Sequence, residues 1–159
     1  IAQKTAALAR SFNMEIMAFD PFLDKKSSAW NNVKNVDLEK LLKGSDVISI
    51  HTPLSESTRH LINSTNLNFM KKTAVIINAA RGGVIDDKAL SEKLRKDEIK
   101  GAALDVFETE PMDVNSGNYF HGLKNVILTP HIAGVTEESN VNVSAMIADK
   151  IDQHLSGSI

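Results

Sequence analysis

The sequence has no cysteine, few aromatic residues and no excess of either charge. Without cysteine there can be no disulfide framework, thiolate nucleophile or thiolate zinc site. The five histidines are scattered along the chain, so we expect no metal centre. A formal net charge of −2 gives no electrostatic reason to expect nucleic acid as a partner. No apolar run approaches the roughly 20 residues that cross a bilayer, so we expect no membrane association and a cytoplasmic location.

The arrangement of apolar residues predicts the fold class. A length of 159 residues with 42% hydrophobic content suits one domain with a real core. Short continuous apolar runs alternate with helical patterns, which favours parallel strands covered by helices on both faces, the doubly wound α/β arrangement. The predicted helices span 1–12, 38–44, 64–70, 88–96 and 136–155, and the predicted strands span 14–20, 46–52, 74–80, 101–107 and 125–129.

Two helix starts carry acidic residues that suit N-caps. Asp37 precedes the pattern that Gly44 ends, and Asp86 or Asp87 can cap the helix that follows them. Asp86 and Asp87 resemble a carboxylate pair of the kind used in catalysis. Because adjacent acids before a helix normally complement its dipole, we interpret them as a cap.

Polar residues follow every predicted strand. In parallel α/β sheets, ligands bind beyond the carboxyl ends of the strands, so these residues should share one rim. Arg81 directly follows a buried run, and in the crevice it can meet an anion, while Gly82 and Gly83 let the backbone turn sharply. The runs end at Asp20, at His51-Thr52-Pro53, at Asn78 to Arg81, at Asp105 and at Pro130-His131.

Four ordered motifs resemble one known family. They are SDVISIHTPLSESTRHLI, ARGGVIDDKAL, GAALDVFETEP and NVILTPHIAGVT, and together they resemble the NAD-binding domain of the D-2-hydroxyacid dehydrogenases over essentially the whole chain. The resemblance implies a Rossmann-like NAD-binding domain over 1–134 and a C-terminal helix over 135–159 that packs against a separate substrate domain. It also implies a strand and a glycine-rich turn upstream of Ile1, so we expect part of a longer two-domain protein that lacks the first strand and the pyrophosphate loop.

The resemblance assigns catalysis to three residues. Arg81 would bind the substrate carboxylate through its planar fork and polarise the oxo group. His131 would exchange a proton with the developing alkoxide, and Glu110 would orient the imidazole. The motif places Glu110 before Pro111, so Glu108 is interpreted as a solvated loop acid. The alternatives are a surface salt bridge for Arg81 and a buried structural role for His131.

The resemblance also assigns the cofactor, NAD. Asp20 would accept hydrogen bonds from the adenosine ribose, and its charge would repel the phosphate of NADP; the alternative is an ordinary turn acid before Pro21. Asp105 would accept a hydrogen bond from the carboxamide. The groove would be lined by Thr52, Pro53, Ala79, Ala133 and Gly134.

The implied function is hydride transfer between NAD and a small D-2-hydroxy or 2-oxo acid, by an enzyme that forms homodimers. Two alternatives remain: a non-catalytic, NAD-responsive binding or dimerisation module of the same family, and an inactive polypeptide. The identity of the acid stays open, because its pocket would come largely from residues outside this chain. The histidines other than His131, including His60, are interpreted as packed or surface residues.

Overall fold

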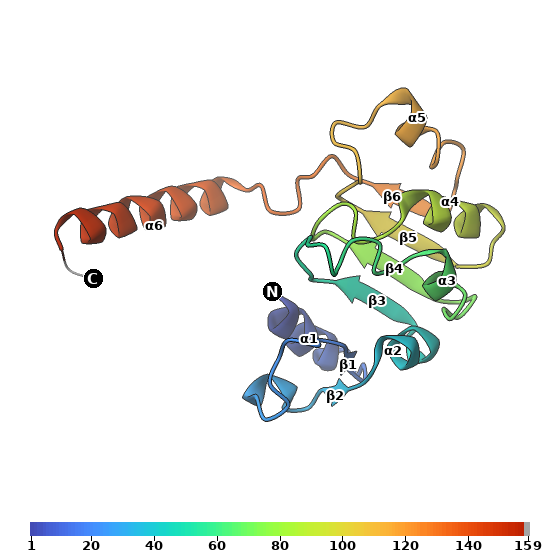
Figure 1. Ribbon diagram of the computed structural model, residues 1–159, viewed down its shortest axis with the longest axis horizontal. Helices are drawn as coiled ribbons and strands as arrows, with labels where there is room; N and C mark the ends of the chain where they lie inside the picture. The colour runs from blue at the N-terminus through green and yellow to red at the C-terminus, as the bar shows by residue number, and fades with distance from the viewer. Residues whose placement is uncertain (158–159) are drawn as a thin grey trace.

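The computed structural model describes residues 1–157, with helices and strands alternating along the chain (Figure 1). No helix within this described range is long and apolar enough to span a membrane. The last two residues of the expected C-terminal segment lie outside it. The elements are α1 (Ala2–Ser11), β1 (Met17–Ala18), a 3-10 turn (Ser28–Trp30), β2 (Lys34–Asn35), α2 (Leu38–Gly44), β3 (Val47–Ile50), α3 (Ser64–Leu67), β4 (Val75–Asn78), α4 (Asp87–Arg95), β5 (Gly101–Leu104), α5 (Val114–Gly117), β6 (Val126–Leu128) and α6 (Glu137–Leu155).

The strands form two parallel sheets. One has four strands in the order β3-β4-β5-β6, and the other pairs β1 with β2. Removal of the first strand from the doubly wound order 3-2-1-4-5-6 separates a block of two strands from a block of three. The chain has the two-stranded block, and its other block has four strands. The α/β fold class is confirmed, and the break between β1 and β3 falls where the sequence analysis expects a strand to be absent.

One face of the four-stranded sheet carries the core. Since paired residues of parallel strands point to the same side, Ile48, Ile76 and Ala102 share this face. Helices α2, α3 and α4 bury it through Leu42, Leu67, Leu90 and Leu94. The position of the strand ends is therefore fixed by a packed apolar layer.

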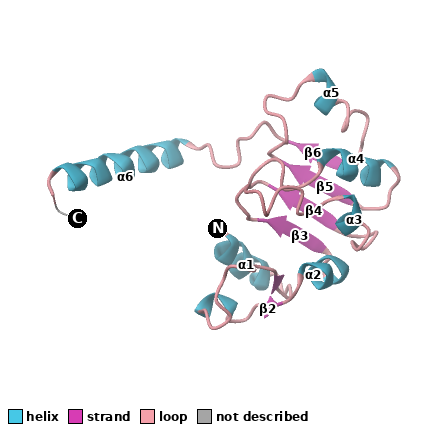
Figure 2. Ribbon diagram, viewed as in Figure 1, coloured by secondary structure: helices cyan, strands magenta, loops and turns pink. Residues whose placement is uncertain are grey.

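The opposite face of this sheet is open, which differs from the expectation of cover on both sides. Val47 is 45% exposed, Ile77 37% and Ile127 67%. Neither α1 nor α6 has a buried residue, and α6 extends away from the sheet (Figure 2). The helices in the described range that could cover this face do not pack on it.

Element ends follow the predicted capping chemistry with one exception. Asp37 accepts a hydrogen bond from Lys40 N, and Asp86 accepts one from Ala89 N. Asp87 is not a cap: its side chain is buried and turns toward another loop.

Several predicted bounds are wrong. Of the strand expected over 14–20, only Met17–Ala18 pairs, because β2 is its single neighbour and is itself two residues long. The helix expected over 64–70 ends at Leu67, and α5 lies in a segment for which no helix was predicted.

Candidate active site

Three loops meet at the carboxyl edge of the four-stranded sheet. Strands β4, β5 and β6 are neighbours and parallel, so the segments that follow them leave the sheet on the same side. These segments carry Arg81, Glu110 and His131, in that order. The predicted catalytic residues are thus brought to one edge, each by a different strand.

His131 and Glu110 form a direct pair. Nδ1 of His131 lies 2.7 Å from Oε2 of Glu110, while Oε1 of Glu110 accepts a hydrogen bond of 2.8 Å from the N–H of Phe107. Burial alone would raise the pKa of Glu110, but the hydrogen bonds from His131 and Phe107 outweigh it and lower the pKa. No hydrogen bond within residues 1–157 uses Nε2 of His131, whose side chain is 50% exposed. That nitrogen is available to a substrate.

The backbone of His131 is held in an unusual conformation by Asp105. His131 has a φ of 55°, in the left-handed region that non-glycine residues seldom adopt. Oδ1 of Asp105 accepts hydrogen bonds from the Thr129 hydroxyl at 2.5 Å and from Ile132 N at 2.9 Å, and Oδ2 accepts one from Ala133 N at 2.9 Å.

These contacts also set the ionisation of Asp105. Burial would raise its pKa, but the hydrogen bonds from Thr129, Ala133 and Ile132 outweigh this and lower it. Asp105 is buried and anchors the loop that presents His131. Its expected contact with the carboxamide of the cofactor remains a prediction.

Arg81 lies at the end of a turn built by Asn78. The buried Asn78 side chain accepts a hydrogen bond from Ala80 N and donates one to the Arg81 carbonyl at 3.0 Å. The Arg81 guanidinium donates to the Ala80 carbonyl at 2.6 Å, and no carboxylate of the described chain forms an ion pair with it. The alternative of a surface salt bridge is therefore not observed. An exposed guanidinium with free donors suits an incoming carboxylate.

Gly82 joins the Arg81 turn to the loop that carries Glu110. A Cβ atom at Gly82 would lie 1.7 Å from the carbonyl oxygen of Phe107, so no side chain fits there. The next residue, Gly83, has a φ of 76°. The two loops are in direct backbone contact, which fixes the turn of Arg81 against the segment that orients Glu110.

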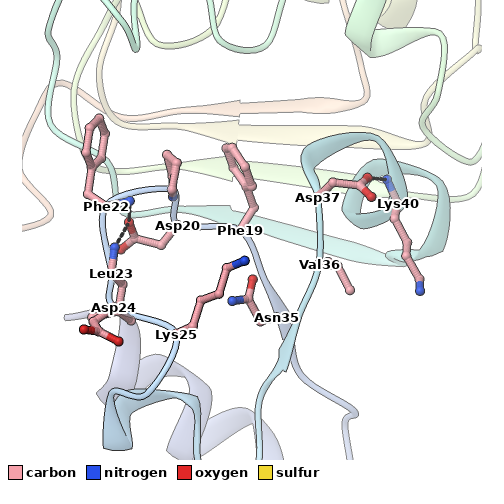
Figure 3. A pocket seen from close by; sticks show the side chains of 11 residues that line it. Phe19, Asp20, Phe22, Leu23, Asp24, Lys25, Asn35, Val36, Asp37 and Lys40 are labelled. Atoms are coloured by element: carbon pink, nitrogen blue, oxygen red, sulfur yellow. Dashed lines mark hydrogen bonds between the residues drawn. The ribbon is translucent and has the colours of Figure 1, made fainter.

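Asp20 lies apart from these loops, in the loop that follows β1 of the two-stranded sheet. It lines an open depression of about 720 Å³ together with Phe19, Lys25 and Lys40 (Figure 3). Its Oδ1 accepts hydrogen bonds from Phe22 N and Leu23 N, as a turn acid does. Oδ2 has no hydrogen-bond partner within residues 1–157, so the turn role leaves one oxygen free for a ribose.

The other residues predicted to line the cofactor groove lie beyond β3, β4 and β6. All are exposed except Thr52, which is half-buried, and a Cβ at Gly134 would meet no atom within 4 Å. A bound dinucleotide could be held by the free oxygen of Asp20 at its ribose and approached closely by this open backbone. The residues are Thr52, Pro53, Ala79, Ala133 and Gly134.

One cluster was missed by the sequence reasoning. Glu108 lies in an exposed loop, as expected for a solvated acid, yet its Oε1 is 2.5 Å from Nε2 of His60 and its Oε2 accepts a hydrogen bond from Asp87 N. His60 and Glu108 are 48 positions apart, and no local pattern joins residues so distant. A lone histidine and the second acid of DVFETEP carried no signal of their contact.

Comparison with known proteins decides the family. The model of the D-isomer specific 2-hydroxyacid dehydrogenase NAD binding domain matches residues 1–133. The chain belongs to this family. It is 44% identical over 156 residues to the (S)-sulfolactate dehydrogenase of Chromohalobacter salexigens, covering 98% of this chain and 50% of that protein. It is 41% identical over 160 residues to the D-3-phosphoglycerate dehydrogenase of Methanocaldococcus jannaschii, covering 100% of this chain and 30% of that protein.

The fold of this chain also matches a solved structure that contains NAD. The NAD-complexed D-isomer specific 2-hydroxyacid dehydrogenase of Lactobacillus delbrueckii ssp. bulgaricus superposes with a TM-score of 0.87 at 28% identity, over 98% of this chain and 50% of that one. The chain therefore spans between 30% and 50% of the length of these relatives, and its residues 1–133 match the NAD-binding domain of the family. Within residues 1–157, no group of three or more histidine or acidic side chains is placed to hold a metal ion.

Proposed function

We propose that this chain supplies the NAD-binding and catalytic side chains of a dehydrogenase that interconverts a small D-2-hydroxy acid and its 2-oxo acid. The observation that carries the proposal is the His131–Glu110 pair, with Nε2 of His131 unbonded, at the same sheet edge as the exposed Arg81. An acid–base group and a free guanidinium at the same edge of one sheet suit a substrate with a carboxylate next to an oxo group.

Each side chain has a separate task in reduction. When bound, reduced NAD supplies the hydride that adds to the oxo carbon. The Arg81 fork binds the carboxylate and orients the substrate. His131 donates the proton on Nε2 to the oxygen that becomes the hydroxyl, and Glu110 keeps the Nδ1 proton in place and stabilises the imidazolium. In oxidation, His131 takes the proton back.

The cofactor and the substrate follow from different parts of the chain. The negative charge of Asp20 favours NAD over NADP, since a 2′-phosphate beside it would be repelled. The proposed substrate is defined only by class, because the two curated relatives are named for different acids, sulfolactate and 3-phosphoglycerate. A homodimer also remains part of the proposal, together with a longer polypeptide that contains this chain.

The test uses the full translated protein that contains residues 1–159. We expect it to oxidise NADH with hydroxypyruvate, glyoxylate or a sulfonated 2-oxo acid. His131→Ala should lower kcat by about 10²- to 10⁴-fold, the usual worth of general acid–base catalysis, and leave NADH binding intact. His121→Ala, which removes an exposed histidine of the same domain, is the matched control. Normal turnover in His131→Ala would overturn the assignment.

Arg81→Lys separates charge from geometry. Lysine keeps the positive charge but lacks the planar fork. The KM for the oxo acid should therefore rise, while the Kd for NADH should change little. A binding or dimerisation module would behave differently. It would bind NADH in the wild type and in both variants and would turn over no oxo acid in any of them.

A further inference from the structure

A second polar cluster involves the loop that carries Glu110. It consists of Glu108, His60 and Asp87, which come from the loop after β5, the loop after β3 and the first turn of α4. The Glu108 N–H donates to Oδ2 of Asp87 at 2.9 Å, and the Asp87 N–H donates to Oε2 of Glu108 at 3.4 Å. Backbone and side chain of each residue thus bind the other.

The third member, His60, contacts the other carboxylate oxygen of Glu108. Nε2 of His60 lies 2.5 Å from Oε1 of Glu108, so both carboxylate oxygens of Glu108 are engaged. The Glu108 side chain is 27% exposed, although its loop is at the surface. His60 has a φ of 50°. The backbone N–H of His60 donates a hydrogen bond of 2.8 Å to the carbonyl of Gly83, in the turn that contains Arg81.

The cluster holds the loop that carries Glu110. Glu110 is two residues beyond Glu108, and its Oε1 accepts a hydrogen bond from Phe107 N, directly before Glu108. On the other side, the Phe107 carbonyl packs on Gly82. Movement of Glu108 would therefore move Glu110 relative to both His131 and the Arg81 turn.

We infer that Glu108, with His60 and Asp87, is a positioning residue that keeps Glu110 within hydrogen-bond reach of His131 and the Glu110 loop against the Arg81 turn. The inference rests on the proposed function for its catalytic consequence. The geometric consequence, the Glu110–His131 contact, does not depend on that function.

The charge state of Asp87 agrees with such a role. Burial raises the pKa of Asp87 to about 6, and the nearby charges of Glu108 and Asp86 act in the same direction, whereas the N–H of Glu108 and His60 lower it. A buried carboxylate of this kind costs stability when it ionises at neutral pH. Its contact with the Glu108 backbone is a positional task that an apolar side chain could not perform.

The experiment measures the contact and the catalysis separately. In the 159-residue chain, the Nδ1–H proton of His131 bonded to Glu110 should give a downfield proton resonance by NMR. Glu108→Ala should abolish that resonance. In the full translated protein, the same variant should lower kcat by about tenfold, since small misplacement of catalytic groups is costly, with an unchanged KM for NADH.

Three further variants make the result specific. Glu92→Ala removes an exposed acid of α4 and is the matched control, which should keep both the resonance and the turnover. Glu108→Gln retains an acceptor oxygen without the charge and should restore most of the turnover. His60→Asn, which tolerates the left-handed backbone, removes only the imidazole contact and serves if Glu108→Ala does not fold.

The outcomes are distinguishable. Retention of the His131 resonance and of kcat in Glu108→Ala or His60→Asn would overturn the positioning role. A wild-type protein that turns over no oxo acid would overturn the proposed function, while loss of the resonance in Glu108→Ala would still support the positioning role.

Discussion

Besides its predicted contact with a cofactor, Asp105 holds the loop that contains His131. Its two oxygens accept hydrogen bonds from Thr129, Ile132 and Ala133, which flank His131 in the sequence. A non-glycine residue with a positive φ is strained, and the conformation persists only when surrounding contacts hold it. The hydrogen bonds to Asp105 hold the backbone of His131 in this way. At the scale of single residues, the position of His131, the proposed acid–base group, is therefore set by a buried carboxylate that need not touch the substrate.

From the raised pKa of Asp87 we predict that this residue makes the folded state less stable as pH rises. Its pKa is about 6 in the folded chain, above the ordinary value of 3.8, so the folded state binds more protons between these values. Stability from this group is complete below pH ~4 and is lost as pH rises through about 6. Asp87→Asn should remove this loss and keep an acceptor for the Glu108 N–H. At pH 7 the variant should gain about 1–3 kcal/mol in the free energy of unfolding.

Urea unfolding at pH 4.5 and pH 7 checks this expectation. The wild type should lose stability from this group between the two pH values, and Asp87→Asn should show a flatter profile. Asp86→Asn is the comparison, since Asp86 is the N-cap and asparagine also caps well. An Asp87→Asn protein less stable than wild type at pH 7 would contradict the assigned cost of the buried charge.

At the scale of elements, the loops after β4 and β5 are packed backbone to backbone at Gly82, with no space for a side chain between them. Any side chain at Gly82 would overlap the Phe107 carbonyl, which is backbone and cannot rotate away. We expect Gly82→Ala to cost about 2 kcal/mol or more by overpacking and to lower turnover by moving the Arg81 turn away from Glu110. Thermal unfolding and NADH oxidation measure the two effects.

Gly134 is the matched control for Gly82. It also lies on a loop at the sheet edge, but a Cβ there meets nothing within 4 Å. Gly134→Ala should change stability by less than about 1 kcal/mol. If the backbone at Gly134 approaches the nicotinamide ring as predicted, NADH affinity should nevertheless fall. Equal losses of stability in the two variants would show that the Gly82 contact is not the cause.

The sequence predicted the elements that close packing dictates and missed those that depend on distant partners. Asp37 and the apolar run 74–80 carry local signals, and the structure has the Asp37 cap and a strand over Val75–Asn78. The strand is shorter than predicted and is buried on one face only, since Ile77 is 37% exposed. Strand β2 is exposed and lies in a polar stretch, so nothing local distinguishes it from a loop. The Glu108–His60 contact depends on the folded topology alone.

The predicted site divides in the same way. Family motifs placed Arg81, Glu110 and His131 on separate strands, and the parallel sheet explains why they reach one edge. The motifs did not reveal that Asp105 anchors the His131 loop, because its partners are backbone N–H groups and a hydroxyl. Such contacts follow from three-dimensional packing rather than from residue identity.

At the scale of the whole molecule, the described chain leaves large apolar surfaces without cover. The open sheet face presents Ile77 and Ile127, and α6 presents exposed apolar residues such as Ile147 and Ile151. Exposed apolar area of this extent is uncommon in monomeric proteins. It agrees with the proposal that this domain functions within a larger polypeptide, as its half-length coverage of relatives also suggests.

The separation of the two sheets leads us to expect that NADH stabilises the folded chain. Asp20 follows β1 and His131 follows β6, so a dinucleotide that reaches from one to the other would bridge two sheets that share no hydrogen-bonded strand pair. A ligand that binds only the folded state stabilises it, by about 2.7 kcal/mol at 100 times its Kd. NADH should therefore raise the midpoint of thermal unfolding, and NADPH should raise it much less.

Asp20→Asn makes the test specific. Asparagine keeps Oδ1 for the Phe22 and Leu23 N–H groups, so the turn persists, but the charge that would repel a ribose phosphate is gone. The variant should lose part of the NADH shift and gain a shift with NADPH, whereas Asp24→Asn, on the same depression, should change neither. A wild-type response that is equal for the two cofactors would show that Asp20 does not select NAD, because its free carboxylate oxygen would then lie outside the ribose site.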